Sequence, residues 1–354
     1  MLQLPVLDPH SAHQLFKKED QNPLEVIHAK LNKQVEKTMS QTLIDTFLYN
    51  EPGELELLIA KLATEDCDEL IYWIIVENQY SFQGINKGHT FLEICRKESR
   101  LDLYKKKIIY VPVCIPPSGA ADFSLGHIGS SSKPGTYVNE LTKRAFAVEH
   151  KQRMSAFESI SKLAQDNTSV IVSDIDEMVD LSDAYKKDFL FCFLRQNHGR
   201  CMIQRYKYQY DIDNAWPTSH QRWLNIINAE YIKTDSTTLA KARSLLLPIC
   251  RYPFSELAYE YSYVFSKETI YRKLNSFSHV DNYNKFHVDR ALLLNTKIYT
   301  KIPNNPILFE KVKLSLSNSP MYVLDNIGLL STGIVSRYYK AAREITRFTD
   351  IQKV

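Results

Sequence analysis

The chain has 354 residues, 44% of them apolar, which is enough to bury the core of one large or two small globular domains. Its 44 basic and 41 acidic residues nearly cancel, and the formal charge of +3 gives no electrostatic reason to expect a nucleic-acid partner. The sequence contains no stretch near the roughly 20 apolar residues of a membrane span, no apolar signal-peptide core and no Cys-x-x-Cys pair. We therefore predict a soluble, reduced, cytoplasmic protein, and export without a cleavable signal stays open.

Residues 10–40 are polar and carry Leu24, Ile27, Leu31 and Val35 at helical spacing, which predicts an amphipathic helical leader over residues 1–40. After this leader, apolar strand-like runs alternate with helical patterns. The strand-like runs are Thr42–Leu48, Leu70–Val76, Lys107–Val113 and Ser169–Ser173, and the helical patterns include Glu54–Leu62 and Tyr137–Leu163. This alternation is typical of β-α-β units, so we predict an α/β fold with a mostly parallel central sheet flanked by helices.

The segment Pro116–Gly135 is rich in Gly, Ser and Pro, and is expected to be a mobile loop that serves either as a lid or as a simple insertion. Further on, Tyr206, Tyr208 and Tyr210 alternate, which predicts an antiparallel strand with one aromatic face. Those rings would either pack in the core or stack on a sugar. The remaining expected elements are a helix over Lys233–Pro248, a strand over Tyr259–Phe265 and a basic C-terminal helix over residues 336–354.

Three acids, Asp174, Asp176 and Glu177, come directly after the apolar run Val170–Val172. Ligands of open α/β sheets collect beyond the carboxyl ends of parallel strands, so these acids are expected at a ligand site. Side chains alternate across a strand, which would place Asp174 and Asp176 on one side. Two such carboxylates can share Mg²⁺ or Mn²⁺, which would in turn hold the phosphates of a substrate. The alternative is an ordinary solvated acidic turn.

Separated segments over most of the chain carry a second, more specific pattern. They are Ile44–Glu51, Ile74–Gly84 with Lys87 and Phe91 after it, Glu149–Arg153 one helix before Ser173–Glu177, and Lys273–Asp281. Together they resemble glycosyltransferase family 17, which includes the enzyme that adds a bisecting N-acetylglucosamine to N-glycans. The most specific match is Glu-x-x-Gln-Arg followed by Ser-Asp-x-Asp-Glu, because both halves and their spacing agree.

The chain also departs from this family. Tyr259 and Glu260 replace an aromatic-histidine pair, which should alter the sugar or acceptor pocket, and Met178-Val179 replaces Ile-Pro. The first predicted helix lacks the acid and the arginine that the family often carries there. The membrane anchor of the animal enzymes is absent as well, so the resemblance is to a bacterial or viral cytoplasmic relative.

The resemblance implies a GT-A fold over residues 41–335, in which an Asp-x-Asp motif holds Mn²⁺ or Mg²⁺ against the diphosphate of a nucleotide sugar. Asp174, Asp176 and His279 are then the expected metal ligands. The expected contacts of the donor are Glu77, Lys87, Arg100, Glu149, Arg153, Asp174 and Lys273. Glu149 and Arg153 share a helix face, so the alternative for them is an exposed intrahelical ion pair. His279 and Lys273 have the alternative of structural or surface roles.

The activity implied is the inverting transfer of a sugar, N-acetylglucosamine from a UDP-linked donor, to a glycan, a lipid-linked sugar or a protein. Inversion needs a general base near the acceptor hydroxyl, and the candidates are Glu177, Glu260 and Asp281. Glu177 has the alternative of capping the helix that follows it. Two other functions stay open: a metal-dependent nucleotidyl or phosphoryl transferase that uses the same carboxylates, and an inactive protein that binds a nucleotide sugar.

Overall fold

The computed structural model describes residues 41–50, 52–120, 140–209, 214–215, 223–242, 250–253, 257–262, 270–271, 273–274, 285–294 and 310–311. The expected helices over residues 1–40 and 336–354 lie outside these ranges, as do most of the Pro116–Gly135 segment and Tyr210. Two predicted site residues, His279 and Asp281, lie outside them too.

Four parallel strands form the centre of the sheet, in the spatial order β3-β2-β1-β4. They are β1 (Thr42–Tyr49), β2 (Leu70–Asn78), β3 (Ile108–Val113) and β4 (Thr168–Val172). A strand that is covered on both faces must be apolar on both, and Leu43 and Phe47 of β1 enter one core while Ile44 and Leu48 enter the other. The predicted α/β class with its parallel central strands is confirmed.

The order of these strands creates a switch point between β1 and β4. The chain proceeds from β1 outward through β2 to β3, and then returns to place β4 on the opposite side of β1. In open α/β sheets, ligands bind beyond the carboxyl ends of the strands at such a switch point. Residues that directly follow β4 therefore lie where an α/β sheet most readily binds a ligand.

The other half of the sheet mixes directions. The antiparallel strand β8 (Trp223–Asn228) joins β4 to β6 (Cys201–Gln209), and β10 (Ala258–Ser262) lies between β6 and β5 (Glu177–Val179). The short strands β7 (Asn214–Ala215), β9 (Cys250–Arg251) and β11 (Glu310–Lys311) complete it.

The predicted aromatic strand is confirmed as β6, which runs antiparallel to β8. Its rings, however, stack on the parallel neighbour β10: Tyr206 lies 6.1 Å from Tyr259 and Tyr208 lies 5.1 Å from Tyr261, measured between ring centroids. Tyr208, Tyr259 and Tyr261 are all buried. Of the two roles expected for these rings, the structure therefore supports core packing rather than an exposed platform for a sugar.

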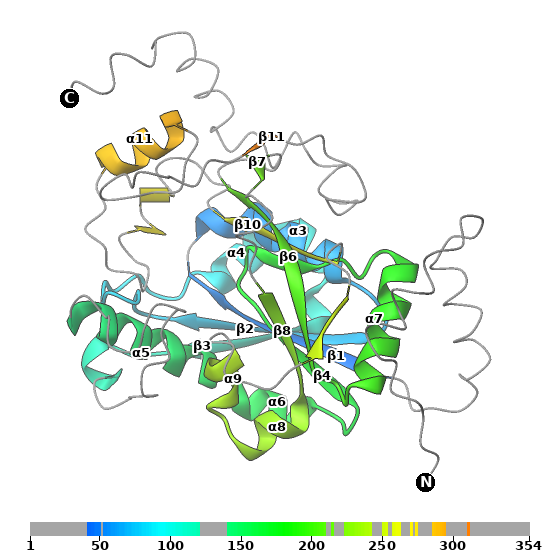
Figure 1. The fold of residues 1–354 in the computed structure, drawn as a ribbon. Coiled ribbons are helices and arrows are strands. Elements are labelled where there is room, and N and C mark those ends of the chain that lie inside the picture. The colour runs from blue at the N-terminus through cyan, green and yellow to red at the C-terminus, as the bar shows by residue number, and fades with distance from the viewer. Residues whose placement is uncertain are drawn as a thin grey trace.

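Helices cover both faces of the sheet (Figure 1). One core is formed with α3 (Leu55–Glu65), α4 (Phe91–Lys97) and α7 (Ala184–Gln196), and the other with α5 (Glu140–Met154), α6 (Phe157–Leu163), α8 (Ala229–Thr234) and α9 (Thr238–Lys241). The other helical segments are α11 (Lys285–Leu294), η1 (Pro52–Glu54), η2 (Ser99–Leu103), η3 (Lys105–Lys107) and η4 (Pro117–Ala120). In the part of the chain described, no helix has the length and apolar character needed to cross a membrane.

Two predicted helices are interrupted. The pattern over Tyr137–Leu163 is divided into α5 and α6 at Ser155, whose hydroxyl donates to the Lys151 carbonyl at 3.0 Å and so competes with the helical hydrogen bonds. The helix predicted over Lys233–Pro248 is interrupted after Thr234: Asp235 ends α8, its carboxylate accepts the Thr237 amide at 2.9 Å, and α9 begins at Thr238, while residues 243–248 lie outside the described ranges. Both predictions of an uninterrupted helix were wrong, and each break lies where a polar side chain bonds to a nearby backbone group.

Candidate functional site at the end of β4

The three predicted acids lie in a tight turn, Asp174–Glu177, which we call the acidic turn. Strand β4 ends at Val172, and the Glu177 amide donates to the Asp174 carbonyl at 3.0 Å before β5 begins. The alternation of side chains expected for Asp174 and Asp176 does not apply, because it requires a strand that continues through them. The acidic turn nevertheless lies directly beyond the carboxyl end of β4, at the switch point of the sheet.

Asp174 contacts a cation that is itself held by a second carboxylate. The Arg153 guanidinium, at the end of α5, contacts the Asp174 carboxylate and donates to the Ser173 carbonyl at 3.0 Å. Glu149, one helical turn earlier, accepts from Arg153 Nε at 3.2 Å and from Nη2 at 3.1 Å. The Arg153 side chain is only 4% exposed, whereas that of Asp174 is 29% exposed. Glu149 and Arg153 are thus brought to the acidic turn and do not form an isolated surface pair.

Asp176, like Asp174, contacts a cation that is itself held by a second carboxylate. Lys273 Nζ lies 3.5 Å from Asp176 Oδ2 and 3.0 Å from Oε1 of Glu54. Glu54 is fully buried, and its other oxygen accepts the Asn50 amide at 3.2 Å just after β1. The sequence analysis identified Lys273 but missed Glu54, since an acid at the start of a predicted helix is also an ordinary helix-start residue.

Among the described residues, the ion pairs around the acidic turn contain more carboxylates than cations. Asp174, Asp176, Glu149 and Glu54 are four carboxylates, and Arg153 and Lys273 are two cations, so the formal charge of the group is −2. Carboxylate oxygens are the ligands that Mg²⁺ and Mn²⁺ prefer. No group of three or more His, Cys, Asp or Glu side chains that could hold a metal occurs among the described residues. Asp174 and Asp176 supply two carboxylates, so a cation bound between them would need further oxygen ligands from substrate or water.

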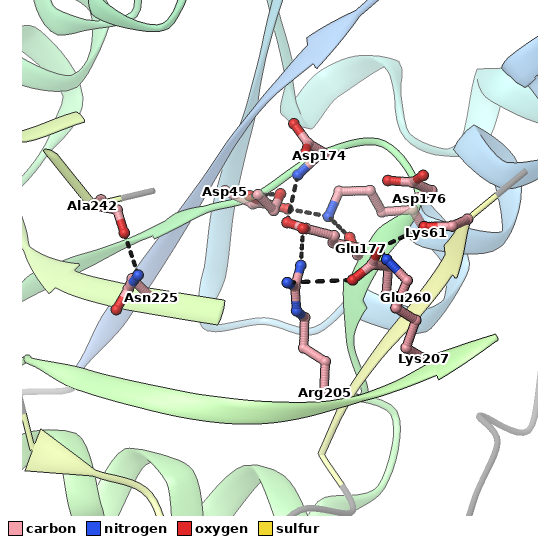
Figure 2. A network of polar contacts seen from close by, with 12 residues as sticks. Asp45, Lys61, Asp174, Asp176, Glu177, Arg205, Lys207, Asn225, Ala242 and Glu260 are labelled. Atoms are coloured by element: carbon pink, nitrogen blue, oxygen red, sulfur yellow. Dashed lines mark hydrogen bonds and ion pairs between the residues drawn. The ribbon is translucent and has the colours of Figure 1, made fainter. Parts of the chain in front are cut away.

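Glu177, a candidate general base, points away from the exposed side of the turn. Its carboxylate accepts the Asp174 amide at 2.9 Å and pairs with Arg205 of β6, and its side chain is 3% exposed (Figure 2). Since a general base must reach the proton that it removes, this geometry favours a structural role in which Glu177 fixes the turn.

Glu260, the second candidate base, lies in the same buried network. Lys207 contacts its carboxylate, Arg205 Nη2 lies 3.3 Å from Oε2, and the Ser262 hydroxyl donates to Oε1 at 2.5 Å. Burial alone would raise the pKa of Glu260, but the positive charges of Lys207 and Arg205 outweigh it and lower that pKa well below the ordinary value. A carboxylate with a depressed pKa is a poor proton acceptor at neutral pH, so Glu260 also fits a structural role.

Glu77, predicted to contact the donor, is saturated by contacts within the fold. Its carboxylate accepts the backbone amides of Thr90 at 2.9 Å and Phe91 at 3.1 Å, the Thr90 hydroxyl at 3.0 Å and the Tyr110 hydroxyl at 2.8 Å. Lys87 Nζ lies 3.3 Å away. Burial would raise the pKa of Glu77, but these donors lower it. Glu77 and Lys87 thus hold the start of α4 against the end of β2.

Arg100 has its partners on the outer face of the molecule. Its guanidinium donates to both carboxylate oxygens of Glu56 at 3.0 and 2.8 Å, and to Glu98 at 2.9 and 2.7 Å. Its side chain is 39% exposed, and neither partner belongs to the acidic turn. Bidentate pairing of this kind ties η2 to the first turn of α3.

Comparison with known proteins adds little to this geometry. No family model matches the chain, and no curated protein matches it. Among solved structures, the chain is similar to a crystal structure of an active-site mutant of LgtC, at 13% sequence identity and a TM-score of 0.27. The similarity covers 58% of this chain and 65% of that chain, which is less than two thirds of its length. The resemblance to glycosyltransferase family 17 stays a prediction.

Proposed function

We propose that the protein is a metal-dependent glycosyltransferase of the GT-A type, which moves a sugar from a nucleotide diphosphate to a hydroxyl acceptor. The observation that carries the proposal is the acidic turn at the sheet's switch point, where each of two aspartates meets a cation. The donor we propose is a UDP-linked sugar, N-acetylglucosamine in the first instance. The acceptor is a glycan, a lipid-linked sugar or a protein hydroxyl.

The chemistry requires that negative charge on a departing diphosphate be stabilised. Arg153 and Lys273 are fixed cations beside the acidic turn, held by Glu149 and Glu54 so that they need no reorganisation when charge develops. Asp174 and Asp176 would hold Mn²⁺ or Mg²⁺, which when bound supplies Lewis-acid stabilisation of the phosphate oxygens. His279 is proposed as a further ligand.

Inverting transfer requires a base on the acceptor side. Glu177 and Glu260 are both buried and paired with cations, so Asp281 is the candidate that we retain for this role. Its carboxyl group would remove the proton of the acceptor hydroxyl while the diphosphate leaves from the opposite face of the sugar.

The first test is thermal stabilisation by a panel of nucleotide sugars, each with and without Mn²⁺. A ligand that binds the native state raises the apparent stability by RT ln(1 + [L]/Kd), so 100-fold excess over Kd adds about 2.7 kcal/mol. We expect stabilisation by UDP sugars only when the metal is present. Mn²⁺ alone and a nucleoside monophosphate, which lacks the diphosphate, are the matched controls.

The second test follows the label of a radiolabelled nucleotide sugar. Release of labelled sugar together with UDP supports glycosyl transfer, to an acceptor or to water. Transfer of a labelled phosphoryl or nucleotidyl group would instead support the alternative transferase, and metal-dependent binding without turnover for any acceptor would support an inactive binding protein.

A further inference from the structure

A group of three buried ionisable side chains lies directly beneath the acidic turn. Lys61 of α3 is fully buried, with Nζ 2.5 Å from Asp45 Oδ2 and 2.7 Å from Glu65 Oε1. Asp45 belongs to the central strand β1 and is itself inaccessible to solvent, as is Glu65. Taking such charges out of water costs several kcal/mol per ion, so a buried ion pair is weak evidence for a role in stability alone.

Each member of this group holds a different residue of the segment that contains the acidic turn. The Ser173 hydroxyl donates to Asp45 Oδ1 at 2.8 Å, just before the turn. Lys61 Nζ donates to the carbonyl oxygen of Glu177 at 2.5 Å, at the end of the turn. The backbone amide of Val179 donates to Glu65 Oε1 at 3.1 Å, in the strand that follows. Figure 2 shows Lys61 between Asp45 and Glu177, with Asp174 and Asp176 around it.

The three side chains are themselves anchored in the core. Glu65 Oε2 accepts the indole N–H of Trp73 at 3.0 Å, and Lys61 Nζ lies 4.9 Å from the centroid of the Phe47 ring. Trp73 belongs to β2 and Phe47 to β1, so the group is attached to two central strands and to α3. The segment that contains the acidic turn is therefore fastened at Ser173, Glu177 and Val179 to the buried centre of the sheet.

We propose that Lys61, Asp45 and Glu65 form a buried positioning cluster, which holds the acidic turn so that Asp174 and Asp176 can bind a divalent cation. The identity of the bound ion rests on the proposed function, whereas the fastening of the turn does not. None of the three residues touches substrate. Residues that orient metal ligands from behind typically change metal affinity 10- to 100-fold when they are replaced.

The test compares two variants with a control. Lys61→Met keeps the length of the side chain but removes its charge, and Ser173→Ala removes only the hydroxyl that donates to Asp45. Lys187→Met is the matched control, because it breaks a lysine–glutamate contact of 2.9 Å, to Glu69, outside the acidic turn. Amide hydrogen exchange of residues 173–179 in the metal-free protein is compared with exchange of β2, and Mn²⁺ affinity is measured by calorimetry.

We expect exchange of residues 173–179 to be about 10-fold faster in Lys61→Met and about 3-fold faster in Ser173→Ala, with β2 unchanged. Mn²⁺ should bind about 10- to 100-fold more weakly to Lys61→Met, and Lys187→Met should match the wild type in both measurements. If Lys61→Met does not fold, Ser173→Ala alone decides the question. Exchange that is unchanged in the turn, or accelerated equally in β2, would overturn the positioning role. Failure of the wild type to bind Mn²⁺ would instead contradict the proposed function, while the exchange result still tests the cluster.

Discussion

Two acidic sites lie beyond the carboxyl ends of the strands on either side of β1, and they differ in what their carboxylates contact. The Glu77 carboxylate, at the end of β2, receives five donors from within the fold, and its side chain is inaccessible to solvent. In the acidic turn after β4, the side chain of Asp174 is 29% exposed and that of Asp176 is 12% exposed, and their carboxylates contact Arg153 and Lys273. Both sites thus lie at the carboxyl end of a strand, but the carboxylates of Asp174 and Asp176 are accessible to solvent and that of Glu77 is not. This accessibility distinguishes a candidate ligand site from a structural one.

The largest effect is expected for Asp176→Ala. The substitution removes one of the two carboxylates proposed to hold the metal, so metal-dependent hydrolysis of the donor should fall by about 1,000-fold, which corresponds to about 4 kcal/mol. The fold should persist, because Lys273 keeps its contact with Glu54. Turnover is measured with a labelled nucleotide sugar and folding by circular dichroism. Asp66→Ala, which breaks only an exposed pair with Lys107, is the control. Turnover like that of the wild type in Asp176→Ala would contradict the metal assignment.

Glu77→Ala should reduce the stability of the protein and leave donor binding nearly unchanged. Loss of a buried carboxylate leaves Lys87, Tyr110 and two backbone amides without their acceptor, and should reduce the free energy of unfolding by about 3–5 kcal/mol. The KM for the donor, measured well below the unfolding temperature, should change less than 3-fold. Urea denaturation measures the free energy of unfolding, and steady-state kinetics measure the KM. A KM that rises more than 10-fold with little loss of stability would show that Glu77 reaches the nucleotide, as the sequence predicts.

The central strands of this fold can be predicted from the sequence, because a strand that is buried on both faces must be built mainly from apolar residues. Apolar runs such as Trp73–Val76 of β2 and Val170–Val172 of β4 indicate strands that are buried on both faces, so their positions and their parallel arrangement could be predicted. The short strand β5 and the antiparallel strand β8 were missed. β5 has only three residues, and its pairing with β10 depends on residues some eighty positions away.

The candidate site was predictable only in part, because part of it depends on contacts between residues that are far apart in the sequence. Local spacing placed Arg153 and Glu149 on one helix face and placed the acids after β4. Contacts between distant residues, such as Lys273 with Glu54 and Lys61 with Asp45, leave no local pattern. The sequence therefore indicated which side chains carry charge, but not that Glu177 points inward to Arg205.

A smaller effect is expected for Glu54→Gln. Lys273 would lose a charged partner at 3.0 Å, while its longer contact with Asp176 at 3.5 Å would remain, so it would be held less precisely. We expect the KM for the nucleotide sugar to rise about 10-fold, with a smaller change in kcat. The control is Glu56→Gln, in the first turn of α3, where the side chain is itself exposed and that of its partner Arg100 is 39% exposed. If Glu56→Gln raises the KM as much as Glu54→Gln, Arg100 contributes to donor binding after all.

The smallest expected effect is on how stability depends on pH, and it has opposite signs for the buried residues Glu65 and Glu77. Burial and the charge of Asp45 raise the pKa of Glu65 above its ordinary value of 4.5, so the native state holds the proton more tightly than the unfolded chain. The stability that Glu65 contributes is complete below 4.5 and is lost as the pH rises through the native pKa. The pKa of Glu77 is lowered, so its contribution is complete above 4.5 and is lost as the pH falls through the native pKa.

Urea denaturation across a pH series separates these two contributions. Glu65→Gln should remove a loss of stability that the wild type shows on raising the pH above 4.5. Glu77→Gln should remove a loss that the wild type shows on lowering the pH below 4.5. An unchanged slope above 4.5 in Glu65→Gln would mean that Glu65 does not retain a proton, because only a proton held more tightly in the native state makes that slope negative. The cluster beneath the acidic turn would then carry a net negative charge in the core, and Lys61 alone would have to balance both acids.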